Sequence, residues 1–180
     1  MSSPLRISVA KANLATATRL AELGRRTFFE TFAADNKSAD MDAFAAQVYG
    51  PEIQLGELQQ ARYTFLLAEM QGELVGFAKL WHGSDLGLPP DKPARQLEIK
   101  QLYVAQDWIG TGLGAALMRR ALEIAQADEA SAVVLGVWEH NERAKAFYQR
   151  YGFREVGEVE FVLGTDVQRD LLYRKGLAGR

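Results

Sequence analysis

The chain has 180 residues, of which 48% are hydrophobic and 24% charged, and this size predicts one compact domain spanning residues 1–180. A formal net charge of minus 2 argues against a nucleic-acid-binding protein, and no apolar stretch approaches the ~20 residues of a transmembrane helix. Because the chain has no cysteine and two histidines, disulfides, an acyl-cysteine intermediate and a histidine-rich metal site are not expected, and we expect a cytoplasmic protein without a metal.

The N-terminal third is predicted to be mostly helical. A short strand pattern covers residues 5–10, and Asn13 is a favourable N-cap for the helix that follows. One face of that helix is formed by residues three or four positions apart, namely Ala17, Ala21, Gly24, Phe28 and Phe32. Residues 38–49 and 52–60 predict two further helices, separated by Gly50-Pro51.

The rest of the chain is predicted to alternate between strands and helices. Residues 62–70 and 73–83 form a hairpin pattern around Gln71-Gly72, and a loop over 83–93 carries three of the five prolines. The remaining strands are expected at 96–104, 131–138, 153–163 and 167–175, and the remaining helices at 112–127 and 141–151. This order predicts an α/β fold with a mixed central sheet flanked by helices.

Three alternating glycines, Gly110, Gly112 and Gly114, lie between a predicted strand and a predicted helix. Their backbone N–H groups can approach an anion closely, and the helix N-terminus adds a partial positive charge that suits a pyrophosphate. The same pattern also serves a tight turn or close helix packing. A Rossmann fingerprint matches poorly, since several residues separate Val104 from Gly110, and a P-loop is excluded by the absence of a Gly-Lys-Ser/Thr ending.

Three linked motifs resemble the GNAT superfamily of N-acetyltransferases in order and spacing: residues 101–104, the glycine turn, and the pattern from Asn141 through Tyr148 to Gly152-Phe153. The resemblance implies a splayed mixed β-sheet with helices on both faces, and acetyl-CoA in a cleft where two parallel strands separate. It assigns residues 62–175 to the cofactor-binding core and residues 13–60 to helices on the substrate side.

The cofactor-binding residues that follow from the turn and the resemblance are Leu102, Tyr103, Val104, Gly110, Thr111, Gly112, Leu113, Gly114, Ala115, Asn141 and Lys145. Backbone N–H groups of residues 102–104 are expected to bind the thioester carbonyl or the pantetheine amides. One position departs from the superfamily, because Ile109 stands where Arg or Gln is usual. We therefore expect weaker cofactor affinity, or compensation by Arg119, Arg143 or Lys145, unless these cations are simply solvated.

The residue that matches the superfamily's general acid is Tyr148, which would protonate the departing thiolate. It lies seven residues after Asn141, so both side chains project from one helix face. Packing in an apolar stripe is the alternative role for Tyr148. The first candidate for the general base is Glu98, followed by Glu139 and His140, although Glu98 can equally be a salt-bridged or exposed residue.

Further segments resemble the PaiA-type spermidine/spermine N-acetyltransferases, namely Thr31-Phe32 with Asn36, residues 136–141 and residues 163–171. This resemblance implies acetyl transfer to a primary amine, with a polyamine as one acceptor class, by direct transfer in a ternary complex. Substrate-binding candidates are Phe28, Phe32, Tyr49, Trp138 and Glu139, and a polyamine would also favour the carboxylates of Glu30, Asp35, Asp40 and Asp42.

Other functions remain open from sequence alone. The acceptor could be an amino acid, an aminoglycoside or a protein N-terminus, and a noncatalytic acyl-CoA-binding sensor would keep the same fold. The terminal strands could also pair between two chains in a homodimer.

Overall fold

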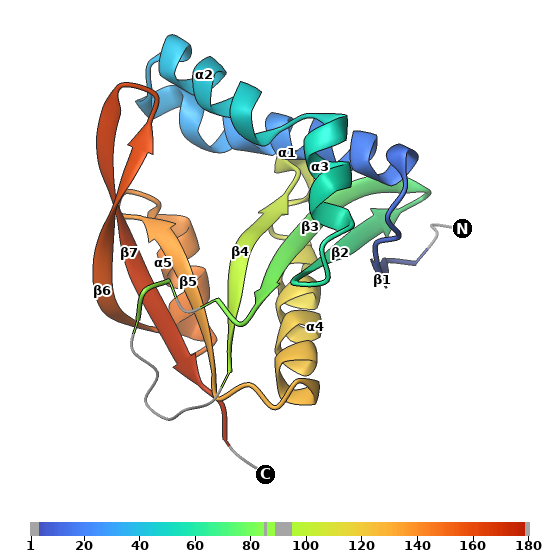
Figure 1. The fold of residues 1–180 in the computed structure, drawn as a ribbon, viewed down its shortest axis with the longest axis vertical. Helices are drawn as coiled ribbons and strands as arrows, with labels where there is room; N and C mark the ends of the chain where they lie inside the picture. The colour runs from blue at the N-terminus through green and yellow to red at the C-terminus, as the bar shows by residue number, and fades with distance from the viewer. Residues whose placement is uncertain (1–3, 85, 89–94, 179–180) are drawn as a thin grey trace.

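The computed structural model describes residues 4–84, 86–88 and 95–178 (Figure 1). The helices and strands follow the predicted order, with differences of one or two residues at their ends. The strands are β1 (Arg6–Val9), β2 (Tyr63–Met70), β3 (Glu73–His82), β4 (Gln96–Val104), β5 (Ala132–Trp138), β6 (Arg154–Leu163) and β7 (Asp166–Gly176). The α-helices are α1 (Leu14–Phe32), α2 (Ser38–Val48), α3 (Pro51–Leu58), α4 (Leu113–Ala127) and α5 (Glu142–Arg150).

The seven strands form one mixed sheet in the order β1-β2-β3-β4-β5-β7-β6, as the predicted fold class requires. The pair β4–β5 is parallel and its neighbours are antiparallel. Pairing between β4 and β5 extends only from Gln96 opposite Ala132 to Glu98 opposite Val134. Beyond that point the two strands diverge toward their C-terminal ends (Figure 1). The parallel pair is therefore closed at one end and open at the other.

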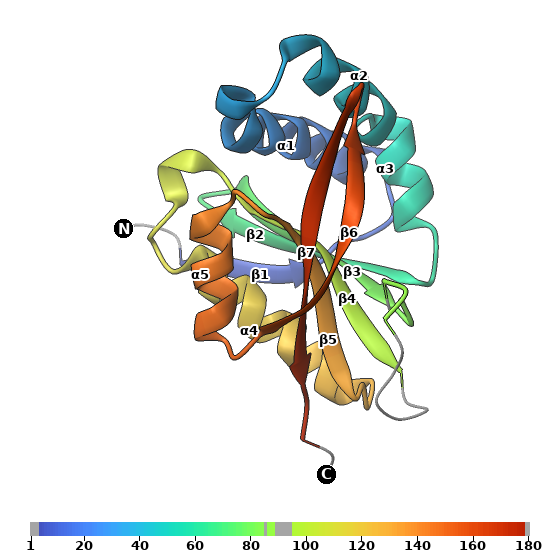
Figure 2. The ribbon, with the colours of Figure 1, turned by 90° about the vertical axis from the view of Figure 1, so that its left-hand side faces the viewer.

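Helices cover both faces of the sheet (Figures 1 and 2). On one face, apolar residues of α4 and α5 such as Leu117 and Tyr148 pack against the main buried cluster. On the other face, Leu20 of α1 packs with aromatic residues of β2 and β3, while Phe28 of α1 and Met41 of α2 form a third cluster. The two helical layers therefore approach the open end of β4 and β5 from opposite sides.

Local sequence signals explain several helix ends. Asn13 Oδ1 accepts a hydrogen bond from Thr16 N at 2.9 Å, which confirms it as the N-cap of α1. Pro51 occupies the first turn of α3, where its missing N–H costs nothing. The helix expected from residue 112 begins at Leu113, because Gly112 is its left-handed N-cap.

Two short 3-10 helices were not expected from the sequence: η1 (Ala33–Asp35) and η2 (Gln106–Trp108). The segment η2 fills the gap between the end of β4 and the glycine turn. The expected loop over residues 83–93 lies partly outside the described residues. At the sheet edges, β6 exposes Val159 and Val162, but the homodimer through the terminal strands stays a prediction.

Candidate active site

The open edge of β4 presents backbone donors. Ala105 N donates to Val75 O on β3 at 2.8 Å. Successive residues of an antiparallel strand direct their N–H groups to opposite sides, so the N–H groups of Leu102 and Val104 point away from β3. They face the side where β5 has separated from β4. This is where the sequence places donors for a thioester carbonyl or an amide.

The glycine turn leads into the N-terminus of α4. Gly110 and Gly112 have φ values of 82° and 89°, and an added Cβ at either would meet no atom within 4 Å. The first intrahelical bond runs from Ala116 N to Gly112 O, and no side chain of the described residues caps the helix. The preceding N–H groups of the helix are therefore available to an anion.

The glycines of the turn serve different purposes at different positions. The positive φ values of Gly110 and Gly112 are turn requirements, and the open space beside them permits close approach of a ligand. Gly114, by contrast, would place a Cβ 3.6 Å from the ring of Phe147, so its small size also serves packing between α4 and α5.

The cations near the turn differ in their availability. Lys145 Nζ donates to Glu139 O at 2.5 Å and to Glu142 Oε1 at 2.6 Å, so its charge is already used at the start of α5. Arg119 and Arg143 are exposed on α4 and α5. Ile109 is 37% exposed, so it presents an apolar side chain where the superfamily usually places a donor.

Tyr148 is buried on the face of α5 that packs against the sheet. Its ring contacts Phe147 and Phe153, with centroids 5.4 and 5.9 Å away, which accounts for the apolar stripe. Among the described residues its hydroxyl has no hydrogen-bond partner. Burial, and secondly the nearby Tyr103, raise the pKa of the Tyr148 phenol well above its usual value, so the group stays protonated at working pH.

Asn141 begins the same helix. Its Oδ1 accepts from Ala144 N at 3.2 Å, so one of its two expected roles, helix capping, is observed. Its role toward the pantetheine arm stays a prediction.

Tyr103 lies at the junction of the two faces. Its side chain interacts with that of Tyr49, whose hydroxyl accepts a hydrogen bond from Gln101 Nε2 at 3.3 Å. Burial raises the pKa of Tyr103 to about 12, and the charge of Asp170 adds to the rise. Tyr103 is thus electrostatically coupled both to Tyr148 on the α5 side and to Asp170 on the α1 side.

Glu98 is 3% exposed and accepts a hydrogen bond from Ser84 Oγ. It stands opposite Trp81 on β3 and Val134 on β5, at the last pair before the strands separate. Glu98 therefore lies at the closed end of the parallel pair, with a hydrogen-bond partner of its own.

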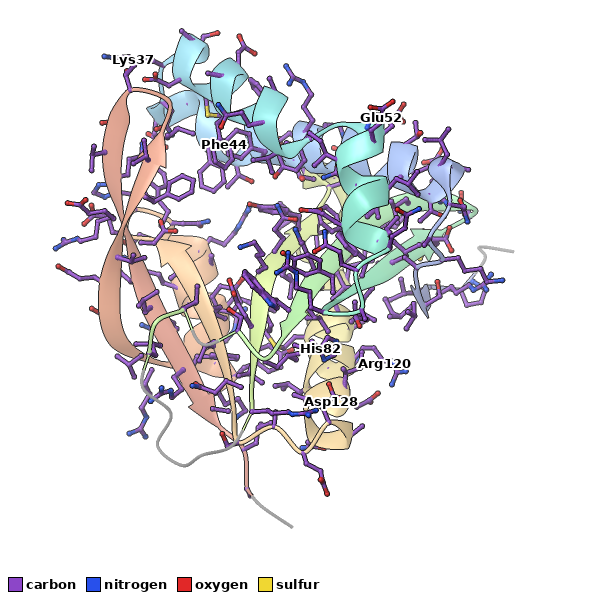
Figure 3. All side chains as sticks on the ribbon, in the orientation of Figure 1. Lys37, Phe44, Glu52, His82, Arg120 and Asp128 are labelled. Carbon is purple, nitrogen blue, oxygen red and sulfur yellow. The ribbon has the colours of Figure 1, made fainter. Side chains whose placement is uncertain are left out.

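Aromatic side chains cover the sheet on the side of α1 and α2. The ring of Phe28 lies 5.3 Å from Phe32 and 5.9 Å from Tyr49, which places it inside an aromatic cluster. Phe32 meets Trp138 of β5 edge-on at 5.7 Å. Phe44, labelled in Figure 3, extends from α2 toward the β6–β7 hairpin. Of the expected substrate residues, Phe32 and Trp138 lie above the open edge, and Phe28 serves as core.

Three of the carboxylates expected near the acceptor, Asp40, Asp42 and Glu139, have other partners. Asp40 is buried and accepts from both Thr165 N and Thr165 Oγ1 at 2.8 Å, which joins α2 to the β6–β7 turn. Glu139 forms an ion pair with Arg169 at 2.6 Å. Asp42 pairs with Arg25 at 3.3 Å. These side chains stabilise the fold locally.

Asp170 is a site residue that the sequence did not single out. It lies on β7 opposite Trp138, and burial raises the pKa of its carboxyl to about 6. Its place in a segment resembling PaiA-type enzymes was the only signal available.

A second polar cluster lies at the far end of the sheet, where Figure 3 labels His82 and Asp128. The ring of His82 contacts Asp128 Oδ2 at 2.6 Å through Nδ1 and Thr64 Oγ1 at 2.8 Å through Nε2. This cluster ties the end of α4 to β2 and β3. The described part of the chain contains no group of three acidic or histidine side chains placed to hold a metal ion. Among the described helices, none is both long and apolar enough to cross a bilayer.

Comparison with known proteins agrees with this geometry. Residues 19–153 match the acetyltransferase (GNAT) family. An uncharacterised N-acetyltransferase from Lactobacillus delbrueckii subsp. lactis is 35% identical over 155 residues, which cover 86% of this chain and 88% of that one. An uncharacterised N-acetyltransferase from Mycobacterium tuberculosis is 36% identical over 113 residues, covering 63% and 67%.

Among solved structures, the PaiA N-acetyltransferase of Thermoplasma acidophilum in complex with coenzyme A aligns with a TM-score of 0.76 at 20% identity, covering 96% of this chain and 99% of that one. This likeness concerns the fold. Together with the family match, the results show that the chain belongs to the acetyltransferase (GNAT) family. It is an N-acetyltransferase that uses acetyl-CoA as acetyl donor.

Proposed function

We propose that this enzyme acetylates a small primary amine, with polyamines as the first acceptor class to test, by direct transfer in the opening between β4 and β5. The observation that carries the proposal is the separation of these strands after Glu98, with Tyr148 on one face and the aromatic residues of α1 and β5 on the other. Residues 62–175 would hold the cofactor, and the helices within 13–60 would cover the acceptor.

The residues present fit acetyl-CoA. The uncapped N-terminus of α4 and the space beside Gly110 and Gly112 suit its pyrophosphate, and Arg119 or Arg143 would supplement these donors. The N–H groups of Leu102 and Val104 would hold the pantetheine amide and polarise the thioester carbonyl. When bound, acetyl-CoA supplies an acetyl group activated as a thioester.

The reaction needs two proton transfers, one to the departing sulfur and one from the acceptor amine. Tyr148 would donate its phenolic proton to the sulfur as the carbon–sulfur bond breaks, since its hydroxyl is buried and has no partner among the described residues. An alkylamine with a pKa of ~10.4 is mostly protonated at neutral pH and must lose a proton before it attacks. Glu98 was the sequence-based candidate for that base.

The acceptor class is supported by the environment on the α1 side. Phe32 and Trp138 offer aromatic surface to an alkyl chain or an ammonium group, and the carboxylates of Glu98 and Asp170 lie on the same side of the sheet. The ion pairs of Glu139 and Asp42 argue against a long acidic track over α1 and α2. A diamine or a short polyamine, which needs few carboxylates, therefore fits this side of the sheet best.

The function is tested by following thiol release from acetyl-CoA with spermidine, spermine, diamines, amino acids, aminoglycosides and peptides. The absence of cysteine gives this assay no protein background. Preferential turnover of polyamines or diamines is expected. Turnover restricted to peptides, amino acids or aminoglycosides would overturn the acceptor assignment, and acetyl-CoA binding without any turnover would favour the sensor.

A further inference from the structure

Asp170 lies on β7, the strand that pairs with β5 on the side away from β4. It pairs across the strands with Trp138, whose ring packs against Phe32 of α1, so both side chains share the face covered by α1. Two residues before Trp138 on β5, Gly136 has no side chain. Asp170 Oδ2 lies 3.6 Å from the position that a Cβ at Gly136 would take. The carboxylate therefore covers a bare stretch of β5 beside the opening.

The carboxylate of Asp170 is half-buried yet has no hydrogen bond or ion pair with the described residues. Most carboxylates so placed in a fold have a partner, as Asp40 and Glu139 do here. Burial without a partner raises the pKa of Asp170 to about 6. A lone carboxylate at the mouth of a reaction site is placed to meet a cation that arrives with the substrate.

Several ionisable groups lie on the same side of the sheet as Asp170. Tyr103 on β4 is coupled to it electrostatically, and Tyr49 lies behind Tyr103 at the end of α2. Arg174 is four residues along β7 and Glu98 is on β4, both on the same side of the sheet. Arg169 points to the opposite side, where Glu139 and Glu158 hold it.

We propose that Asp170 is the general base of the transfer, accepting a proton from the ammonium form of the acceptor amine directly or through one water. The proton leaves nitrogen for a carboxylate oxygen, and the freed electron pair forms the N–C bond to the thioester carbonyl. The carbon–sulfur bond breaks with the electron pair on sulfur, which takes the proton of Tyr148. The nitrogen then gives up a second proton, which returns to the phenolate of Tyr148 and leaves the neutral amide. Asp170 releases the proton that it accepted to solvent.

Glu98 is less well placed for this step. It accepts a hydrogen bond from Ser84 and sits where β4 and β5 are still paired. Asp170 lies on β7 opposite Trp138, the last residue of β5, at the end of the sheet where β5 has separated from β4. The assignment rests on the acetyltransferase site proposed above, and it replaces Glu98 as the base within that site.

The test compares the pH dependence of kcat for wild type, Asp170→Asn and Glu98→Gln with the preferred alkylamine. Asp166→Asn, which neutralises the exposed carboxylate at the first residue of β7, is the matched control. We expect Asp170→Asn to lower kcat about 100-fold at pH 7. The loss should shrink toward pH 9.5, because the amine then loses its proton to solvent. In wild type, kcat should fall as the pH drops below about 6, where Asp170 becomes protonated. The variant should lack this fall.

A second readout separates this role from a structural one. A weakly basic acceptor such as methoxyamine is unprotonated at neutral pH, so Asp170→Asn should acetylate it at nearly the wild-type rate while acetyl-CoA affinity stays unchanged. The assignment would be overturned if kcat of Asp170→Asn still fell below pH 6 as in wild type. It would also be overturned if the substitution lowered kcat by the same factor with the alkylamine and with methoxyamine. Wild type that releases no thiol with any amine would instead refute the acetyltransferase site itself.

Discussion

At the residue scale, the hydroxyl of Tyr148 is the group that we propose as the general acid. Tyr148→Phe keeps the ring packed against Phe147 and Phe153 and removes only the proton donor. We expect turnover to fall about 100-fold or more while acetyl-CoA binds as before. Thiol release and calorimetric titration measure the two quantities, and Tyr151→Phe on the same helical face is the control. Undiminished turnover would leave Tyr148 with a packing role alone.

The contact between Asp40 and Thr165 makes stability depend on pH in a defined direction. Two hydrogen bonds from Thr165 hold the pKa of Asp40 below its usual value. A carboxyl whose folded pKa lies below the unfolded ~3.9 stabilises the fold above that pH and loses this contribution as pH falls through the folded pKa.

Asp40→Asn should therefore unfold at lower urea than wild type at pH 7, with the difference narrowing below pH 4. Urea titrations across this range measure it, and Asp42→Asn is the exposed control. A difference that stays constant with pH would show that ionisation of Asp40 is not involved.

Asp40 also shows which contacts could not be predicted from the sequence. Asp40 and Thr165 are 125 positions apart, so only the folded chain shows that this carboxylate closes the β6–β7 turn and does not meet a substrate. Glu139 is similar, since its partner Arg169 comes from another strand. Asp170 is the converse case, because its lack of a partner becomes visible only when its neighbours are placed.

At the scale of elements, the glycine turn before α4 gives the sharpest test. Gly112→Glu would put a carboxylate at the helix N-terminus that the pyrophosphate needs, so acetyl-CoA affinity should fall about 100-fold or more. Gly72→Glu controls for backbone strain, because Gly72 also has positive φ and open space around its Cβ position, in the β2–β3 turn. Both variants should lose about 1 kcal/mol of stability. Equal affinity in both would refute the pyrophosphate site.

The spacing of apolar residues and the positions of turn residues were sufficient to predict the order and type of the main elements. Aromatic and aliphatic residues on both faces, together with the Gln71-Gly72 turn, predicted β2 and β3, and helical spacing of apolar residues predicted α1 and α4. The three-residue helix η2 was missed because so short a segment has no periodicity. The separation of β4 from β5 followed only from the family resemblance, since the length over which two distant strands pair is set by the register of the whole sheet.

At the scale of the molecule, two helical layers meet at one opening in the sheet. Figures 1 and 2 show α4 and α5 on one face of the sheet and α1 to α3 on the other. Tyr148 of α5 packs in the cluster on the first face, and Phe32 of α1 packs against Trp138 on the second. A donor held on one face and an acceptor on the other can be bound together. The chain has no cysteine to carry the acetyl group, and we propose direct transfer in a ternary complex.

Initial rates measured while both acetyl-CoA and the preferred amine are varied test this claim most directly. Direct transfer predicts double-reciprocal lines that intersect, and an enzyme mass that is unchanged after incubation with acetyl-CoA alone. Parallel lines, together with a protein that gains an acetyl group and passes it to the amine in a second step, would contradict direct transfer.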